Sequence, residues 1–167
     1  GFATDAGLES DAGLESWLEL GVPVADAATV VHQPLDADTE VPMVRGGQGS
    51  TMLPLSIRAA GFDIPGTGHE RMWPALDVRA EAPGSAGLDP LPLFEITGYP
   101  VWFERDGDAW SFPYFGMVLP DDAVPVESLV GRTVLVEATM WPAHDDAITT
   151  TVEFVIGAAP DSRVDGQ

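Results

Sequence analysis

Short segments in which apolar and polar residues alternate recur along the chain between turns rich in Gly, Pro and Asp. Apolar side chains fall at alternate positions in residues 52–60, 72–81, 133–141 and 148–156. A period of two places such side chains on one face of a β-strand. The 18 glycines and 15 prolines suit loops and edge strands better than helices. The sequence therefore predicts an all-β fold, an antiparallel two-sheet sandwich with about eight strands.

Residues 99–115 contain the clearest hairpin pattern. Two apolar, aromatic-rich segments flank a short turn, and Asp106-Gly107 suits the two positive-φ positions of a type I′ turn. The expected register places Phe103 opposite Trp110 on the core side of the hairpin.

The last two alternating segments resemble the final strands of bacterial Ig-like domains. Residues 130–139 read VGRTVLVEAT and, after a short acidic turn, residues 149–156 read TTTVEFVI. Such domains occur on secreted and envelope proteins. The resemblance covers residues 130–157 and implies an Ig-like Greek-key sandwich.

The N-terminal residues differ in character from the rest. The hexapeptide DAGLES occurs twice in tandem over residues 5–16. Gly, Ser and acidic residues at this density are typical of an extended spacer. We therefore expect an acidic tether over residues 1–21, the sandwich over residues 22–160 and a flexible tail over residues 161–167. A short helix through Leu14, Trp17, Leu18 and Leu20 is the alternative for the end of the tether, because these residues have helical spacing.

Charge and composition exclude several classes of partner and chemistry. Seven Arg, no Lys and 27 acidic residues give a net charge of −20, which repels phosphate backbones and anionic lipid head groups. No apolar run approaches the length of a membrane span. The absence of Cys removes disulfides, thiolate zinc sites and cysteine nucleophiles. The chain begins at Gly1 rather than Met, as expected after removal of a signal or lipid-anchor segment. We expect an exported bacterial protein: periplasmic, tethered to the outer membrane or extracellular.

A repeated hexapeptide suggests a copper site. Residues 72–77 (MWPALD) and 140–145 (MWPAHD) differ at one position, and a His lies near each Met. Thioether sulfur favours Cu(I), and imidazole accepts either copper state. The candidate ligands are therefore His69, Met72, Met140 and His144. The alternative is that Met72 and Met140 fill the core, since both lie at the inward phase of their strands.

Acidic residues in turns suggest calcium as a second candidate metal. Calcium takes six to eight oxygen ligands, so a site would have to join two loops. The candidate ligands are Asp36, Asp38 and Glu40 in one segment and Asp145 and Asp146 in another. The alternative is solvated turn residues, because nearby acids are expected by chance in so acidic a chain.

Aromatic residues provide a candidate binding surface. Trp102, Trp110 and Tyr114 lie in or beside the hairpin pattern, and exposed aromatic rings suit the faces of sugars or a protein partner. The alternative is that these rings fill the core or cover a sheet edge. No Gly-x-Ser-x-Gly elbow is present, and we expect no enzyme. The predicted function is a non-catalytic binding or structural module of an exported protein, and the alternative is a periplasmic metal-binding protein with copper or calcium.

Overall fold

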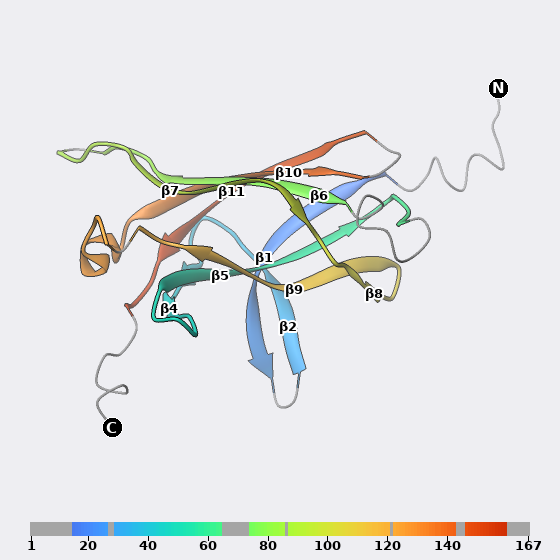
Figure 1. Ribbon diagram of the computed structural model, residues 1–167, viewed down its shortest axis with the longest axis horizontal. Coiled ribbons are helices and arrows are strands. Elements are labelled where there is room, and N and C mark those ends of the chain that lie inside the picture. Colours follow the sequence, from blue (N-terminus) through green and yellow to red (C-terminus); the bar gives the residue numbers. More distant parts are fainter. Residues whose placement is uncertain are drawn as a thin grey trace.

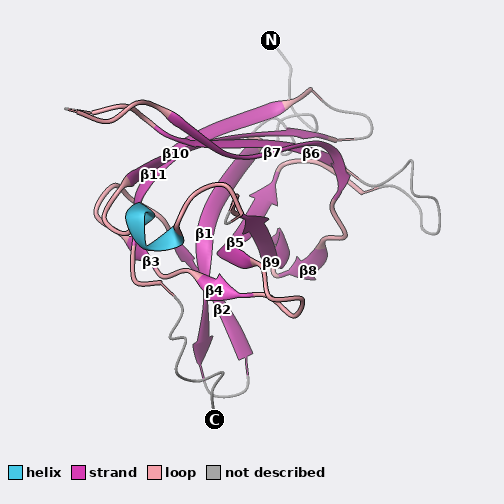
Figure 2. Ribbon diagram, turned by 60° about the vertical axis from the view of Figure 1, so that its left-hand side comes forward, coloured by secondary structure: helices cyan, strands magenta, loops and turns pink. Residues whose placement is uncertain are grey.

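Two curled β-sheets pack face to face in the computed structural model of the chain (Figure 1). The structure describes residues 15–26, 29–64, 74–85, 87–120, 122–142 and 146–159. Within these residues there are eleven strands and one turn of 3-10 helix, Val126–Leu129, which Figure 2 shows in cyan. The described residues contain no helix long and apolar enough to cross a membrane. The first copy of the hexapeptide repeat and the predicted tail lie outside the described residues.

Sheet I has the strand order β2-β1-β5-β9-β8, with β4 paired to β5, and all its pairs are antiparallel. Its strands are β1 (Trp17–Asp26), β2 (Thr29–Pro34), β4 (Val44–Arg45), β5 (Thr51–Ala60), β8 (Glu104–Asp106) and β9 (Ala109–Val118).

Sheet II has the order β3-β11-β10-β6-β7, in which β3 is parallel to β11 and the other pairs are antiparallel. Its strands are β3 (Glu40–Val41), β6 (Ala75–Ala82), β7 (Leu91–Pro100), β10 (Thr133–Trp141) and β11 (Ile148–Ile156). The hairpins β1–β2, β4–β5 and β8–β9 belong to sheet I, whereas β6–β7 and β10–β11 belong to sheet II. The chain therefore returns to each sheet several times.

The core lies between the two sheets and follows the alternation seen in the sequence. Leu53, Leu55 and Ile57 of β5 are fully buried, as are Val134 and Val136 of β10. Aromatic rings join the two sheets, since Phe115 of β9 lies 5.8 Å from Phe94 and 5.3 Å from Tyr99 of β7 between ring centroids. The predictions of an all-β two-sheet sandwich and of adjacent strands at 133–141 and 148–156 are confirmed. The strand number exceeds the expected eight: β1 was not predicted, and β3, β4 and β8 are only two or three residues long.

The N-terminal boundary of the sandwich differs from the prediction. β1 begins at Trp17, and Leu18 and Leu20 are buried in the core. Residues 17–21 therefore belong to the sandwich and not to the tether. The alternative of a short helix is wrong for residues 17–20, because alternate side chains rather than every third or fourth point inward.

The predicted register of the 99–115 hairpin is also wrong. Tyr99 and the residue after it belong to β7 of sheet II, and the chain then crosses to sheet I before β8 begins. Arg105, not Phe103, lies opposite Trp110. The turn consists of Gly107, at a φ of 63°, and the residue that follows it.

Candidate functional site

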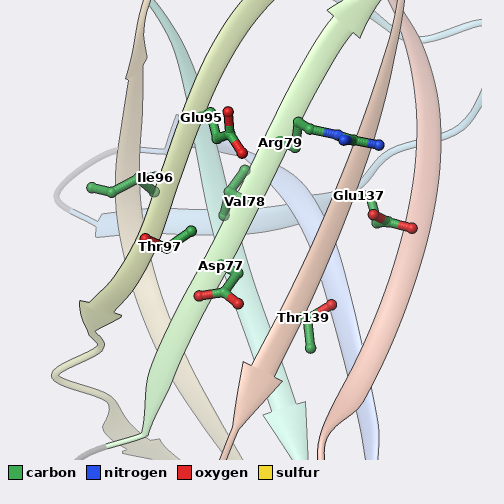
Figure 3. A pocket seen from close by; sticks show the side chains of 8 residues that line it. All are labelled: Asp77, Val78, Arg79, Glu95, Ile96, Thr97, Glu137 and Thr139. Carbon is green, nitrogen blue, oxygen red and sulfur yellow. The ribbon is translucent and has the colours of Figure 1, made fainter.

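Rows of polar side chains cross the outer face of sheet II, the face turned away from sheet I. In one row Glu95 of β7, Arg79 of β6, Glu137 of β10 and Thr151 of β11 lie directly opposite one another. Directly opposed residues in antiparallel sheets have Cβ atoms about 5 Å apart. Arg79 therefore has a carboxylate on the strand at each side, as Figure 3 shows.

The next row places an exposed indole at the end of the same face. Asp77 lies opposite Thr139, whose hydroxyl is 3.0 Å from that of Thr149. Asp77 accepts two hydrogen bonds, one from the Gly98 N–H at 2.8 Å and one from the Trp141 indole N–H at 3.0 Å. Trp141 is 51% exposed, so Asp77 fixes the position of a ring that solvent can reach.

Among the hollows lined by described residues, three neighbouring ones on this sheet have Arg79 in their lining. The first has a volume of about 190 Å³ and is lined by Asp77, Glu95, Thr97, Glu137 and Thr139 in addition to Arg79 (Figure 3). The second, of about 430 Å³, extends toward Pro92 and Phe94, and the third, of about 100 Å³, extends toward Leu135 and Thr151. Together they form a shallow depression centred on Arg79, which we call the Arg79 face.

The Arg79 face is acidic overall. Strands β6, β7, β10 and β11 carry one Arg and five acidic residues, which gives 1 − 5 = −4: Asp77, Glu81, Glu95, Glu137 and Glu153. Arg79 makes no ion pair with any residue that the structure describes. Its guanidinium donors and the neighbouring carboxylate acceptors are thus open to a ligand, and the net charge opposes an anionic one.

The three aromatic residues predicted as a binding surface do not share one face. Trp110 packs against the core, and its indole N–H donates to the Phe62 carbonyl at 3.2 Å. Tyr114 is exposed on the outer face of sheet I, and Trp102 is 53% exposed in the connection from β7 to β8. A bulge in β9 opposite Ser56 breaks the alternation that would have kept Trp110 and Tyr114 on one side.

The structure describes one of the four predicted copper ligands. Met140 is fully buried and lies opposite Leu76 and Ile148 in sheet II. It is therefore a core residue, as the alternative interpretation held. His69, Met72 and His144 lie outside the described residues. Among those described, no group of three or more His, Cys, Asp and Glu side chains could hold a metal ion.

The two acidic segments predicted to bind calcium lie at opposite ends of β11. Glu40 is opposite Val155 near the end of this strand, whereas Asp146 precedes its first residue. At about 3.3 Å per residue this separation exceeds 20 Å. Asp36 instead closes its own turn, accepting hydrogen bonds from the Asp38 N–H at 2.9 Å and the Thr39 hydroxyl at 3.0 Å. Asp38 lies in that turn, and Asp145 lies outside the described residues.

A hydrogen-bonded Ser, His and Glu group, which the sequence did not indicate, lies on the outer face of sheet I. His32 Nδ1 is 2.7 Å from the Ser56 hydroxyl and Nε2 is 2.9 Å from Glu19 Oε1. Burial lowers the pKa of His32 from its usual 6.5, although Glu19 opposes the shift. Ser56 is only 1% exposed, so a substrate carbonyl could not reach its hydroxyl. The group holds β1, β2 and β5 together.

No protein-family model matches the chain, and no curated protein is significantly similar to it. The fold and the Arg79 face define a β-sandwich protein with an open, acidic, polar surface beside an exposed indole.

Proposed function

We propose that the chain is a non-catalytic binding module of an exported bacterial protein, with an Ig-like Greek-key sandwich, and that it binds a neutral carbohydrate on the Arg79 face. The observation that carries the proposal is the open depression around Arg79 beside Trp141, whose indole is fixed by Asp77.

The chemistry of this face suits sugar hydroxyl groups. A hydroxyl both donates and accepts, so it can bond to Glu95 or Glu137 and to the Arg79 guanidinium at the same time. The C–H face of a sugar ring can pack on the Trp141 indole, which combines a large apolar surface with a polar edge. The net charge of −4 on the four strands disfavours acidic polysaccharides and phosphorylated ligands.

The location is supported by the sequence. The likeness of residues 130–157 to Ig-like domains of secreted and envelope proteins fits an exported protein. Copper binding would require His69, Met72 and His144, none of which is described, and the two acidic segments of the calcium candidate lie at opposite ends of β11. The proposal therefore rests on sheet II.

Electrophoresis through gels that contain neutral polysaccharides tests the proposal. We expect the chain to be retarded by at least one of xylan, mannan, hydroxyethyl cellulose or starch. Trp141→Ala and Arg79→Ala should each weaken binding about tenfold or more, because loss of a central anchor typically costs 2 kcal/mol or more.

Trp102→Ala is the matched control, since Trp102 is 53% exposed and Trp141 is 51% exposed, but Trp102 lies outside the Arg79 face. The control should bind as the unmodified chain does. Equal losses in the two Trp variants, or no retardation by any neutral polysaccharide, would count against the proposal.

A further inference from the structure

Exposed sheet edges offer unpaired N–H and C=O groups to other strands, and proteins protect them by short length, charge, proline or bulges. The described sheets end in β2, β8, β3 and β7, and β4 pairs only with β5. Of these five strands all but β2 are protected, β4 by its length of two residues. β8 is three residues long and all three are charged, and β3 is two residues long. β7 contains Pro92 and Pro100, and its register with β6 shifts twice.

β2 has none of these features except a proline at its last position. It reads TVVHQP, and its register with β1 is unbroken from Pro34 to Thr29. Val30 is 54% exposed and Val31 is 46% exposed, and Val24 lies opposite Val31 on β1 with a similar exposure. The β1–β2 hairpin also projects away from sheet II in both views of the molecule (Figures 1 and 2).

The hydrogen-bond pattern identifies the groups of β2 that face outward. The Leu35 N–H donates to the Leu20 carbonyl at 3.3 Å, which makes this a hydrogen-bonded pair of the β1–β2 ladder. Such pairs alternate in antiparallel sheets. Gln33 and Val31 therefore bond to β1, whereas the N–H and C=O groups of His32 and Val30 point to the open edge.

We propose that two copies of the chain associate by antiparallel pairing of their β2 strands across a two-fold axis at Val31. The outward N–H and C=O groups of Val30 then bond to those of His32 in the second copy. The outward groups of His32 bond in the same way to those of Val30 in the second copy. The two Val31 residues face each other as a non-hydrogen-bonded pair. Val24 and Val31 share one face of the hairpin, so these residues of the two copies form one continuous apolar strip on that face, while Val30 lies on the other face beside His32 of the second copy. The contact is isologous, as in most homodimers.

Charge favours a second copy at this edge. Each chain has a net charge of −20, so two copies can approach closely only where acidic side chains are absent. β2 contains no acidic or basic residue other than His32, whose pKa is lowered by burial. Salt screens the repulsion between the two molecules, so the dimer should strengthen as the NaCl concentration rises. A basic peptide held at this edge by charge would show the opposite dependence.

The absence of Cys from the sequence allows a direct test by crosslinking. Opposed residues of a non-hydrogen-bonded pair have Cα atoms about 4.5 Å apart, within the range of a disulfide. Val31→Cys should therefore form a covalent dimer rapidly under mild oxidation. Val118→Cys is the matched control, because Val118 is also 46% exposed but belongs to β9 and not to the β2 edge, and it should crosslink slowly.

Sedimentation equilibrium of the unmodified chain gives a second measurement. We expect a monomer–dimer equilibrium whose dissociation constant falls with added NaCl, and Val30→Lys should leave only monomer by adding a charge on each side of the axis. Circular dichroism should show the same fold for this variant. Crosslinking of Val31→Cys no faster than of Val118→Cys, or a monomer at every salt concentration, overturns the proposal.

Discussion

At the scale of single residues, His32 shows how one side chain can depend on the absence of another. Its ring lies over Gly21, where a Cβ would be 2.5 Å from both the Gln33 carbonyl oxygen and His32 Cε1. Gly21 therefore leaves the space in which His32 reaches Ser56 and Glu19. Arg58 and Asp106 also influence the titration of this ring, the first lowering and the second raising its pKa.

The lowered pKa of His32 predicts a loss of stability in acid. As the pH falls below 6.5, the unfolded chain takes up a proton at His32, whereas burial keeps the folded chain from doing so. The free energy of unfolding therefore decreases as the pH is lowered, until the pH passes the pKa of His32 in the folded state. The melting temperature should therefore drop more between pH 8 and pH 5 in the unmodified chain than in His32→Gln, which does not titrate. If the melting temperature falls equally with decreasing pH in the two proteins, the result would contradict a lowered pKa of His32 in the folded state.

At the scale of elements, local alternation predicted the strands that are long and buried on one side. Leu53, Leu55 and Ile57 show the pattern clearly, and β5 formed as expected. β1 was missed because Trp17, Leu18 and Leu20 fit a helical period as well as a strand, and only pairing with β5 decides between the two.

The change of sheet between Tyr99 and Arg105 could not be predicted for a related reason. Alternation states which side of a strand is apolar, but it does not state which sheet the strand joins. The Arg79 face was missed on the same ground. Its outward positions follow from the alternation, whereas their grouping depends on the lateral order of β7, β6 and β10.

The place of β1 in the core gives a stability prediction at this scale. Leu20 is buried, so Leu20→Ala should lower the free energy of unfolding by about 2–5 kcal/mol, as expected for loss of a buried side chain and the cavity it leaves. Val24→Ala, in the exposed part of the same strand, should cost much less. Urea denaturation of both variants measures the difference. Similar losses would indicate that β1 does not contribute its N-terminal half to the core.

At the scale of the whole molecule, the charge of −20 acts on the folded state itself. Like charges held on one compact surface repel one another and favour the unfolded chain, and salt screens this repulsion. The melting temperature should therefore rise with NaCl at neutral pH. Measurement in the Val30→Lys background separates this effect from association of two copies. A melting temperature that does not change with salt would contradict the view that repulsion limits stability.

The alternation of hairpins between the sheets has a consequence for biosynthesis. β10 lies between β6 and β11 in sheet II, yet it follows nine other strands in the described chain. A nascent chain that ends before Thr133 can form the β6–β7 hairpin but lacks the strand that completes the sheet beside it. The apolar faces of strands already made then stay uncovered, and such intermediates are open to proteases and aggregation. Among the described strands, the β10–β11 hairpin is thus made after all the others and completes sheet II beside β6.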